Sequence, residues 1–97
     1  MQLQIKQHIE IVDKGNMFVI ETEIGSSYLR YYISDNTIEL FSAYVPQSLR
    51  GNGHAASLIL FALQFAVLNG YWVRAACPAV KEYIRQYPEW SYIVKRT

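Results

Sequence analysis

The feature of this sequence that most constrains its fold is a change of period near residue 52. Before that point, runs rich in β-branched and aromatic residues alternate with short turn-like segments, which is the pattern of strands. After it, apolar residues recur on nearly every turn of a helix between residues 55 and 68, and Gly70 supplies a stop signal. The sequence therefore predicts an antiparallel meander over residues 1–45, followed by one long helix that is buried on more than one side.

The expected elements follow in the order β-β-β-β-α-β-α-β, which defines an α+β fold. The second helix is expected to begin at Pro78 and to end before Pro88, because proline suits a first helical position and stops a helix that precedes it. The expected strands are residues 3–11, 17–23, 27–34, 37–45 and 71–76, with "WSYIV" (90–94) as a last edge strand.

Length and composition limit the classes of function. The 97 residues are enough for one domain, 1–97, with one modest core. Nine basic against eight acidic residues, spread along the chain, predict neither a nucleic-acid footprint nor a membrane-binding patch. His8, His54 and Cys77 lack metal-ligand spacing. The lone cysteine and an N-terminus without an apolar signal core predict a soluble cytoplasmic protein, as a monomer or weak homodimer.

The junction between meander and helix, Arg50-Gly51-Asn52-Gly53, predicts an anion site. If Asn52 caps the helix, the N–H groups of Gly53, His54 and Ala55 point out of its positive end, where phosphate is the usual occupant. Glycines leave room for a phosphate to approach the backbone, and Arg50 can add a charged donor. A tight turn with a helix cap is the plain structural alternative.

Three phosphate-loop patterns compete at this junction. The Walker pattern fails because no Gly-Lys-Ser/Thr follows. The dinucleotide pattern is met literally by Gly51, Gly53 and Ala56, but the acidic residue expected about twenty positions later is absent. The third pattern, Arg/Gln-x-x-Gly-x-Gly/Ala after a strand, is met by Arg50, Gly53 and Ala55.

On this third pattern, "VPQSLRGNGHAASLI" resembles the coenzyme A pyrophosphate loop of the GNAT superfamily of N-acetyltransferases. From about Met17 onward the chain is similar to the small single-domain branch of about 100 residues. The features that carry the resemblance occur here in the same order: Val45-Pro46, Arg50-Gly51-Asn52-Gly53, Cys77, Tyr83-Ile84 and Pro88-Glu89.

The resemblance implies a GNAT-like fold: a mostly antiparallel mixed sheet, two main helices, and a pair of strands, 37–45 and 71–76, that part at their C-terminal ends. The pantetheine arm of acetyl-CoA would enter that wedge and the loop would hold its pyrophosphate. The cofactor-binding residues implied are Tyr44, Val45, Arg50, Gly51, Asn52, Gly53, His54 and Ala55.

The resemblance further implies an acetyl-CoA-dependent N-acetyltransferase that acts on an unidentified amine, of a small molecule or a protein, with direct acyl transfer favoured. Cys77 would face the wedge, either as a covalent acyl carrier or as part of its wall. Glu39 is a candidate general base, or else a water-facing strand residue.

The sequence departs from the small branch where that branch usually has protonable groups. Ser42 and Ala43 replace a His-Thr pair, and Tyr87 replaces a His. The alternative function is therefore a non-catalytic module that binds coenzyme A or a protein partner and retains the fold.

Overall fold

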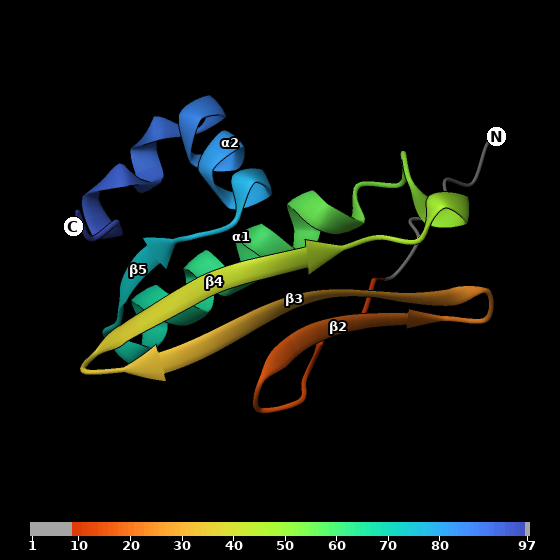
Figure 1. The fold of residues 1–97 in the computed structure, drawn as a ribbon, viewed down its shortest axis with the longest axis horizontal. Helices are drawn as coiled ribbons and strands as arrows, with labels where there is room; N and C mark the ends of the chain where they lie inside the picture. The colour runs from red at the N-terminus through yellow and green to blue at the C-terminus, as the bar shows by residue number, and fades with distance from the viewer. Residues whose placement is uncertain (1–8, 97) are drawn as a thin grey trace, which may run out of the picture.

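The computed structural model describes residues 9–96, and Figure 1 shows their arrangement. One five-stranded sheet has the order β1-β2-β3-β4-β5, antiparallel from β1 to β4 and parallel between β4 and β5. The strands are β1 Val12–Asp13, β2 Met17–Thr22, β3 Gly25–Ser34, β4 Thr37–Tyr44 and β5 Trp72–Ala75. The helices are α1 His54–Asn69 and α2 Pro78–Gln86, with 3₁₀ helices η1 Gln47–Leu49 and η2 Pro88–Ile93.

The hairpins form where turn chemistry predicts them. Asp35 and Asn36 both adopt positive φ angles, 52° and 62°, between β3 and β4. That conformation matches the twist of the flanking strands in a two-residue hairpin, and Asp and Asn tolerate it better than most residues. The three predicted meander strands within residues 17–45 and the two predicted helices are thus confirmed, as is the α+β class.

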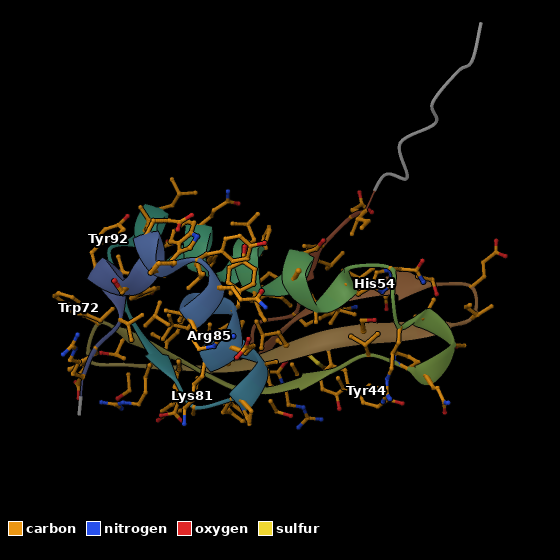
Figure 2. The ribbon with its side chains drawn as sticks, turned by 90° about the horizontal axis from the view of Figure 1, so that it is seen from above. Tyr44, His54, Trp72, Lys81, Arg85 and Tyr92 are labelled. Carbon is orange, nitrogen blue, oxygen red and sulfur yellow. The ribbon has the colours of Figure 1, made fainter. Side chains whose placement is uncertain are left out.

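The core lies between α1 and one face of the sheet, and Figure 2, seen from above, shows α1 along that face. Alternate residues of β3 are buried, as expected for a strand covered on one side. Residues of α2 and η2 join the same core beside β5. Fully buried side chains from each contributing part include Phe18, Leu29, Ile38, Leu63, Val73 and Val80.

Two predicted strands differ from the structure. The first strand was expected over residues 3–11; residues 3–8 lie outside the described residues, while Ile9 and Ile11 pack on the core without strand pairing, and β1 begins at Val12. The predicted edge strand at 90–94 is wrong. Pro88 starts the 3₁₀ helix η2, and Val94 makes only an isolated bridge with Val73.

The strands β4 and β5 part as predicted. They pair from Thr37 opposite Trp72 to Leu40 opposite Ala75. The N–H groups of Ala76 and Cys77 then both donate to the carbonyl of Leu40, at 3.0 and 3.1 Å, and the chain turns into α2. Along its other edge, β4 forms a β-bulge against β3. Tyr31 is opposite Leu40 and Arg30 is opposite Ser42, so Phe41 is an extra residue in β4. The departure of β5 leaves the second half of β4 without a partner along one edge among residues 9–96.

Candidate functional site

A groove of about 390 Å³ opens where β4 ends and α1 begins. Tyr44 and His54, which are labelled in Figure 2, mark its two sides. The groove is lined by Ala43, Tyr44, Val45, Leu49, Arg50, Gly51, Gly53, His54, Ala55 and Ala56. The structure therefore brings together every residue that the sequence assigned to a cofactor except Asn52.

Asn52 does not cap α1. Its Nδ2 donates to the carbonyl of Leu49 at 2.9 Å, so its side chain points back toward η1. The N-cap is Gly53, in the left-handed conformation (φ 76°, ψ 17°), and it has no side chain with which to cap. The first hydrogen bond of the helix runs from Ser57 N–H to the Gly53 carbonyl, at 3.0 Å. The expected cap is wrong because the turn places the Asn52 side chain on the preceding segment.

The start of α1 nevertheless presents unpaired donors. Within residues 9–96, no group accepts a hydrogen bond from the N–H groups of His54, Ala55 and Ala56. Such N–H groups at a helix N-terminus carry partial positive charge. They lie at the wall of the groove, so the groove combines a concave shape with donors suited to an anion.

The two loop glycines have a conformational reason as well as a steric one. Gly51 and Gly53 have φ angles of 89° and 76°, which L-residues with side chains rarely adopt. A Cβ at either position would meet no protein atom within 4 Å. The space beside both glycines is therefore open rather than filled by a packed neighbour.

Arg50 is fixed at the edge of the groove by its own main chain. Its Nε donates to the carbonyl of Val45 at 3.1 Å, across the end of β4. This bond orients an exposed guanidinium beside the loop. The site therefore has one oriented cationic side chain next to its backbone donors.

His54 is the site residue whose environment the sequence did not reveal. It is 6% exposed, and its Nδ1 lies 2.9 Å from the Oγ of Ser27, which is 0% exposed. The sequence predicts His54 beside a phosphate, but it indicates no hydrogen-bond partner for the side chain. A usable signal was present, since Ser27 is the small polar residue in the buried alternation of β3, with Leu29 and Tyr31.

Neither candidate catalytic residue lines the groove. Glu39 lies on β4, with its Oε1 3.7 Å from Arg74 NH1 on β5, and both side chains are partly exposed. Cys77 is the N-cap of α2, is 5% exposed and belongs to the hydrophobic core. Both residues lie beside Leu40, where β4 and β5 part. Glu39 precedes Leu40 in β4, and the N–H of Cys77 donates to the Leu40 carbonyl.

The departures from the small branch occupy different surroundings. Ala43 lines the groove and Ser42 is half-buried beside it on β4. Tyr87 is exposed at the end of α2, where its ring lies 4.7 Å from that of Tyr83.

Residues 9–96 contain no group of three or more His, Cys, Asp or Glu side chains that could hold a metal ion. The helices of that range include none that is long and apolar enough to cross a membrane.

Comparison with known proteins now adds to this geometry. A search of curated proteins found no match. The chain is similar in structure to a GCN5-like protein from Staphylococcus aureus solved by NMR in solution, with a TM-score of 0.73 and 20% sequence identity over 95% of this chain and 93% of that one. The family model described as GCN5-related N-acetyl-transferase matches residues 17–93. The chain belongs to the GCN5-related N-acetyltransferase family.

Proposed function

We propose that the chain binds acetyl-CoA in the groove and transfers its acetyl group directly to an amine. One observation carries the proposal: the free edge of β4 runs continuously into the unpaired N–H groups at the start of α1. A ligand with an extended polar arm at one end and phosphates at the other fits this sequence of features. Membership of an acetyltransferase family supports acetyl-CoA as the ligand of that shape.

The pyrophosphate is assigned to the loop. Its oxygens would accept from the backbone of Gly51, Gly53, His54 and Ala55, with the Arg50 guanidinium as a charged donor. The open space beside both glycines supports this assignment. Asn52 would act indirectly, since its bond to Leu49 shapes the loop.

The acyl end is assigned to the wedge. The pantetheine arm would pair with the free edge of β4 near Tyr44 and Val45, and a backbone N–H would stabilise the oxyanion. The neutral amine attacks the thioester carbonyl, the C–S bond breaks, coenzyme A leaves as the thiolate, and the nitrogen loses a proton. Holding the two reactants together supplies much of the rate.

Glu39 and Cys77 have different roles in this proposal. Glu39 is the candidate acceptor for the proton of the amine, because it lies on β4 next to the wedge and is partly exposed. Cys77 is assigned to the wall behind the wedge, because a side chain buried in the core is poorly placed to attack a thioester.

A binding module without catalysis is the second candidate. It is favoured by the ion pair that holds Glu39 against Arg74, and by the absence of protonable side chains at Ser42 and Ala43. Release of free thiol from acetyl-CoA in the presence of mixed small amines and a lysine-rich peptide separates the two functions. Amine-dependent release supports the enzyme, whereas binding without release supports the module.

Binding itself is tested with a matched pair of glycine variants. Gly51 and Gly15 have φ angles of 89° and 88°, and both have open space around them, but only Gly51 lines the groove. At a hundred times its Kd, acetyl-CoA should stabilise the parent by about 2.7 kcal/mol. We expect Gly51→Val to lose this stabilisation and Gly15→Val to keep it, as measured by denaturation with and without acetyl-CoA. Equal stabilisation of both variants would show that the pyrophosphate binds elsewhere.

A further inference from the structure

We propose that the buried Ser27–His54 pair is a positioning device that fixes the start of α1 for phosphate binding. The inference rests on the proposed function, because it assigns a role within the same groove. Neither residue is proposed to react; the pair acts on the backbone N–H groups that follow Gly53.

The pair is a built feature of the interior. Ser27 lies on the inward face of β3 and His54 is the first residue of α1, 27 positions away in the sequence. Theirs is the one buried hydrogen bond between side chains within residues 9–96. A buried polar pair of this kind selects one geometry, since each partner is left unsatisfied if the other moves.

The pair is needed because α1 lacks an ordinary cap. Gly53 has no side chain, and the Asn52 side chain donates to the Leu49 carbonyl instead of capping the helix. A capping side chain normally fixes the first turn of a helix. Here that turn carries the unpaired donors, so its position decides whether they converge on a phosphate.

The other side-chain bonds of the loop do not reach the sheet interior. Arg50 bonds to Val45 and Asn52 bonds to Leu49, five and three residues away, so both bonds join the loop to adjacent chain. His54 alone among the side chains of the loop bonds to β3. It lines both the groove and a second cavity, of about 340 Å³, that Thr22, Glu23 and Asn52 help to line. A shift of His54 would therefore move the groove wall and the helix start together.

The hydroxyl chemistry suits a permanent anchor. A serine hydroxyl can donate to an unprotonated Nδ1 or accept from a protonated one. The bond can therefore form with either tautomer of the imidazole. Loss of the bond is predicted to change the position of the N–H groups at the start of α1, and so to affect only the phosphate end of the ligand.

The test compares two donors that share the thioester arm. Acetyl-CoA carries the pyrophosphate, and S-acetylpantetheine carries no phosphate. We expect Ser27→Ala to weaken acetyl-CoA binding about tenfold and to leave S-acetylpantetheine binding unchanged, as followed by NMR titration. His54→Asn, whose amide can occupy the place of Nδ1, should keep most of the parental preference for acetyl-CoA.

A matched control distinguishes positioning from general destabilisation. Thr37 is a second buried hydroxyl residue, at the far end of β4 from the groove, so Thr37→Ala should lower the melting temperature without changing the ratio of the two affinities. If Ser27→Ala does not fold, His54→Phe, which keeps an aromatic ring but has no atom to bond Ser27, is expected to show the same loss of preference.

The outcomes separate the two proposals. A parent that prefers acetyl-CoA, together with folded Ser27→Ala and His54→Phe variants that keep that preference, would overturn the positioning role alone. A parent that binds neither donor would overturn the proposed function, and the positioning role with it.

Discussion

The two ends of α1 use the same residue type in the same conformation for opposite purposes. Gly53 before the helix and Gly70 after it have φ angles of 76° and 72°. At Gly70 the left-handed turn closes the helix: its N–H bonds to the carbonyls of Ala66 and Val67, and Tyr71 N–H reaches Ala66 at 2.8 Å. At Gly53 the same turn leaves three N–H groups without an acceptor in the described chain.

The direction of the helix, and not the local backbone conformation, therefore decides which end can bind an anionic ligand. A left-handed residue after a helix satisfies carbonyls, whereas Gly53 before the helix accepts only from Ser57 and leaves the three amides that precede Ser57 without an acceptor in the described chain. The cavity near Gly70, lined in part by Trp72 and Tyr92, lies at the negative end of α1. The groove near Gly53 lies at the positive end, which favours an anion.

The largest effect should come from exchanging these glycines for alanine. Because both have positive φ angles and open surroundings, Gly53→Ala and Gly70→Ala should each lower the free energy of unfolding by about 1–2 kcal/mol. Of the two, only Gly53 lines the groove, so Gly53→Ala alone should weaken acetyl-CoA binding, by about tenfold or more. Urea denaturation and calorimetric titration measure the two quantities separately.

That contrast would break if Gly70→Ala weakened binding as much as Gly53→Ala. Loss of affinity would then follow from a destabilised helix, and the special role of the N-terminal end would be lost.

A smaller effect is expected from Arg50→Ala. It removes one charged donor from a site made otherwise of backbone amides, so acetyl-CoA affinity should fall several-fold in dilute buffer and less at high salt, where charges are screened. Calorimetry at two ionic strengths measures this difference. Arg85→Ala is the control, since Arg85 is exposed on α2 and pairs with Glu82; an equal loss in that variant would indicate a general charge effect.

Local patterns were sufficient to predict most of the fold. The strand composition of β3, the turn between residues 34 and 37 and the glycine after residue 69 each depend on a few neighbouring residues, and each is found as predicted. The parting of β4 and β5 came instead from the family resemblance, because no local pattern shows where two strands 35 residues apart, as for Thr37 and Trp72, cease to pair.

The predictions that were wrong or incomplete depend on contacts with residues distant in the sequence or on the conformation of a turn. The edge strand at 90–94 is wrong because strand-like composition cannot reveal that β5 offers only one bridging position, at Val73. The cap at Asn52 is wrong because its side chain found a carbonyl three residues back. The burial of His54 was missed because its partner is on another strand.

The ionisation of Tyr31, which packs near the C-terminal half of α1, should make the free energy of unfolding depend on pH in the alkaline range. Tyr31 stacks on Phe18 at 4.5 Å, near Phe65 of α1, and its hydroxyl donates to Asp13 Oδ1 at 2.7 Å. Burial, and then the Asp13 carboxylate, raise the pKa of Tyr31 well above its usual range. The folded-state pKa is thus higher than the unfolded one, so the contribution is complete below about pH 10 and is lost as pH rises further.

We therefore expect the parent to lose stability above about pH 10 more steeply than Tyr31→Phe, which has no phenol to ionise. Urea denaturation across that range measures the slopes. Acetyl-CoA binding at neutral pH should be the same in both proteins. Parallel slopes would show that Tyr31 does not couple ionisation to folding.

The smallest effect on activity is expected from Cys77→Ala. This substitution tests whether acetyl transfer needs the thiol of Cys77 in addition to the backbone donors at the start of α1. Cys77 is buried in the core at the start of α2, and its N–H, which bonds to Leu40, remains after substitution. Cys77→Ala should therefore cost about 1 kcal/mol of stability and keep acetyl-CoA affinity and most of the turnover.

The same residue provides the sharpest test of direct transfer, because a covalent route would leave a trace on it. An acyl-cysteine intermediate would require the Cys77 thiolate to attack the thioester and retain the acetyl group until an amine arrives. Parent protein incubated with acetyl-CoA alone would then gain the mass of one acetyl group on the peptide that contains Cys77, and Cys77→Ala would lose turnover while it still bound the cofactor. We expect neither result, because a side chain that is 5% exposed and packed in the core is not placed to reach a ligand lying along the edge of β4.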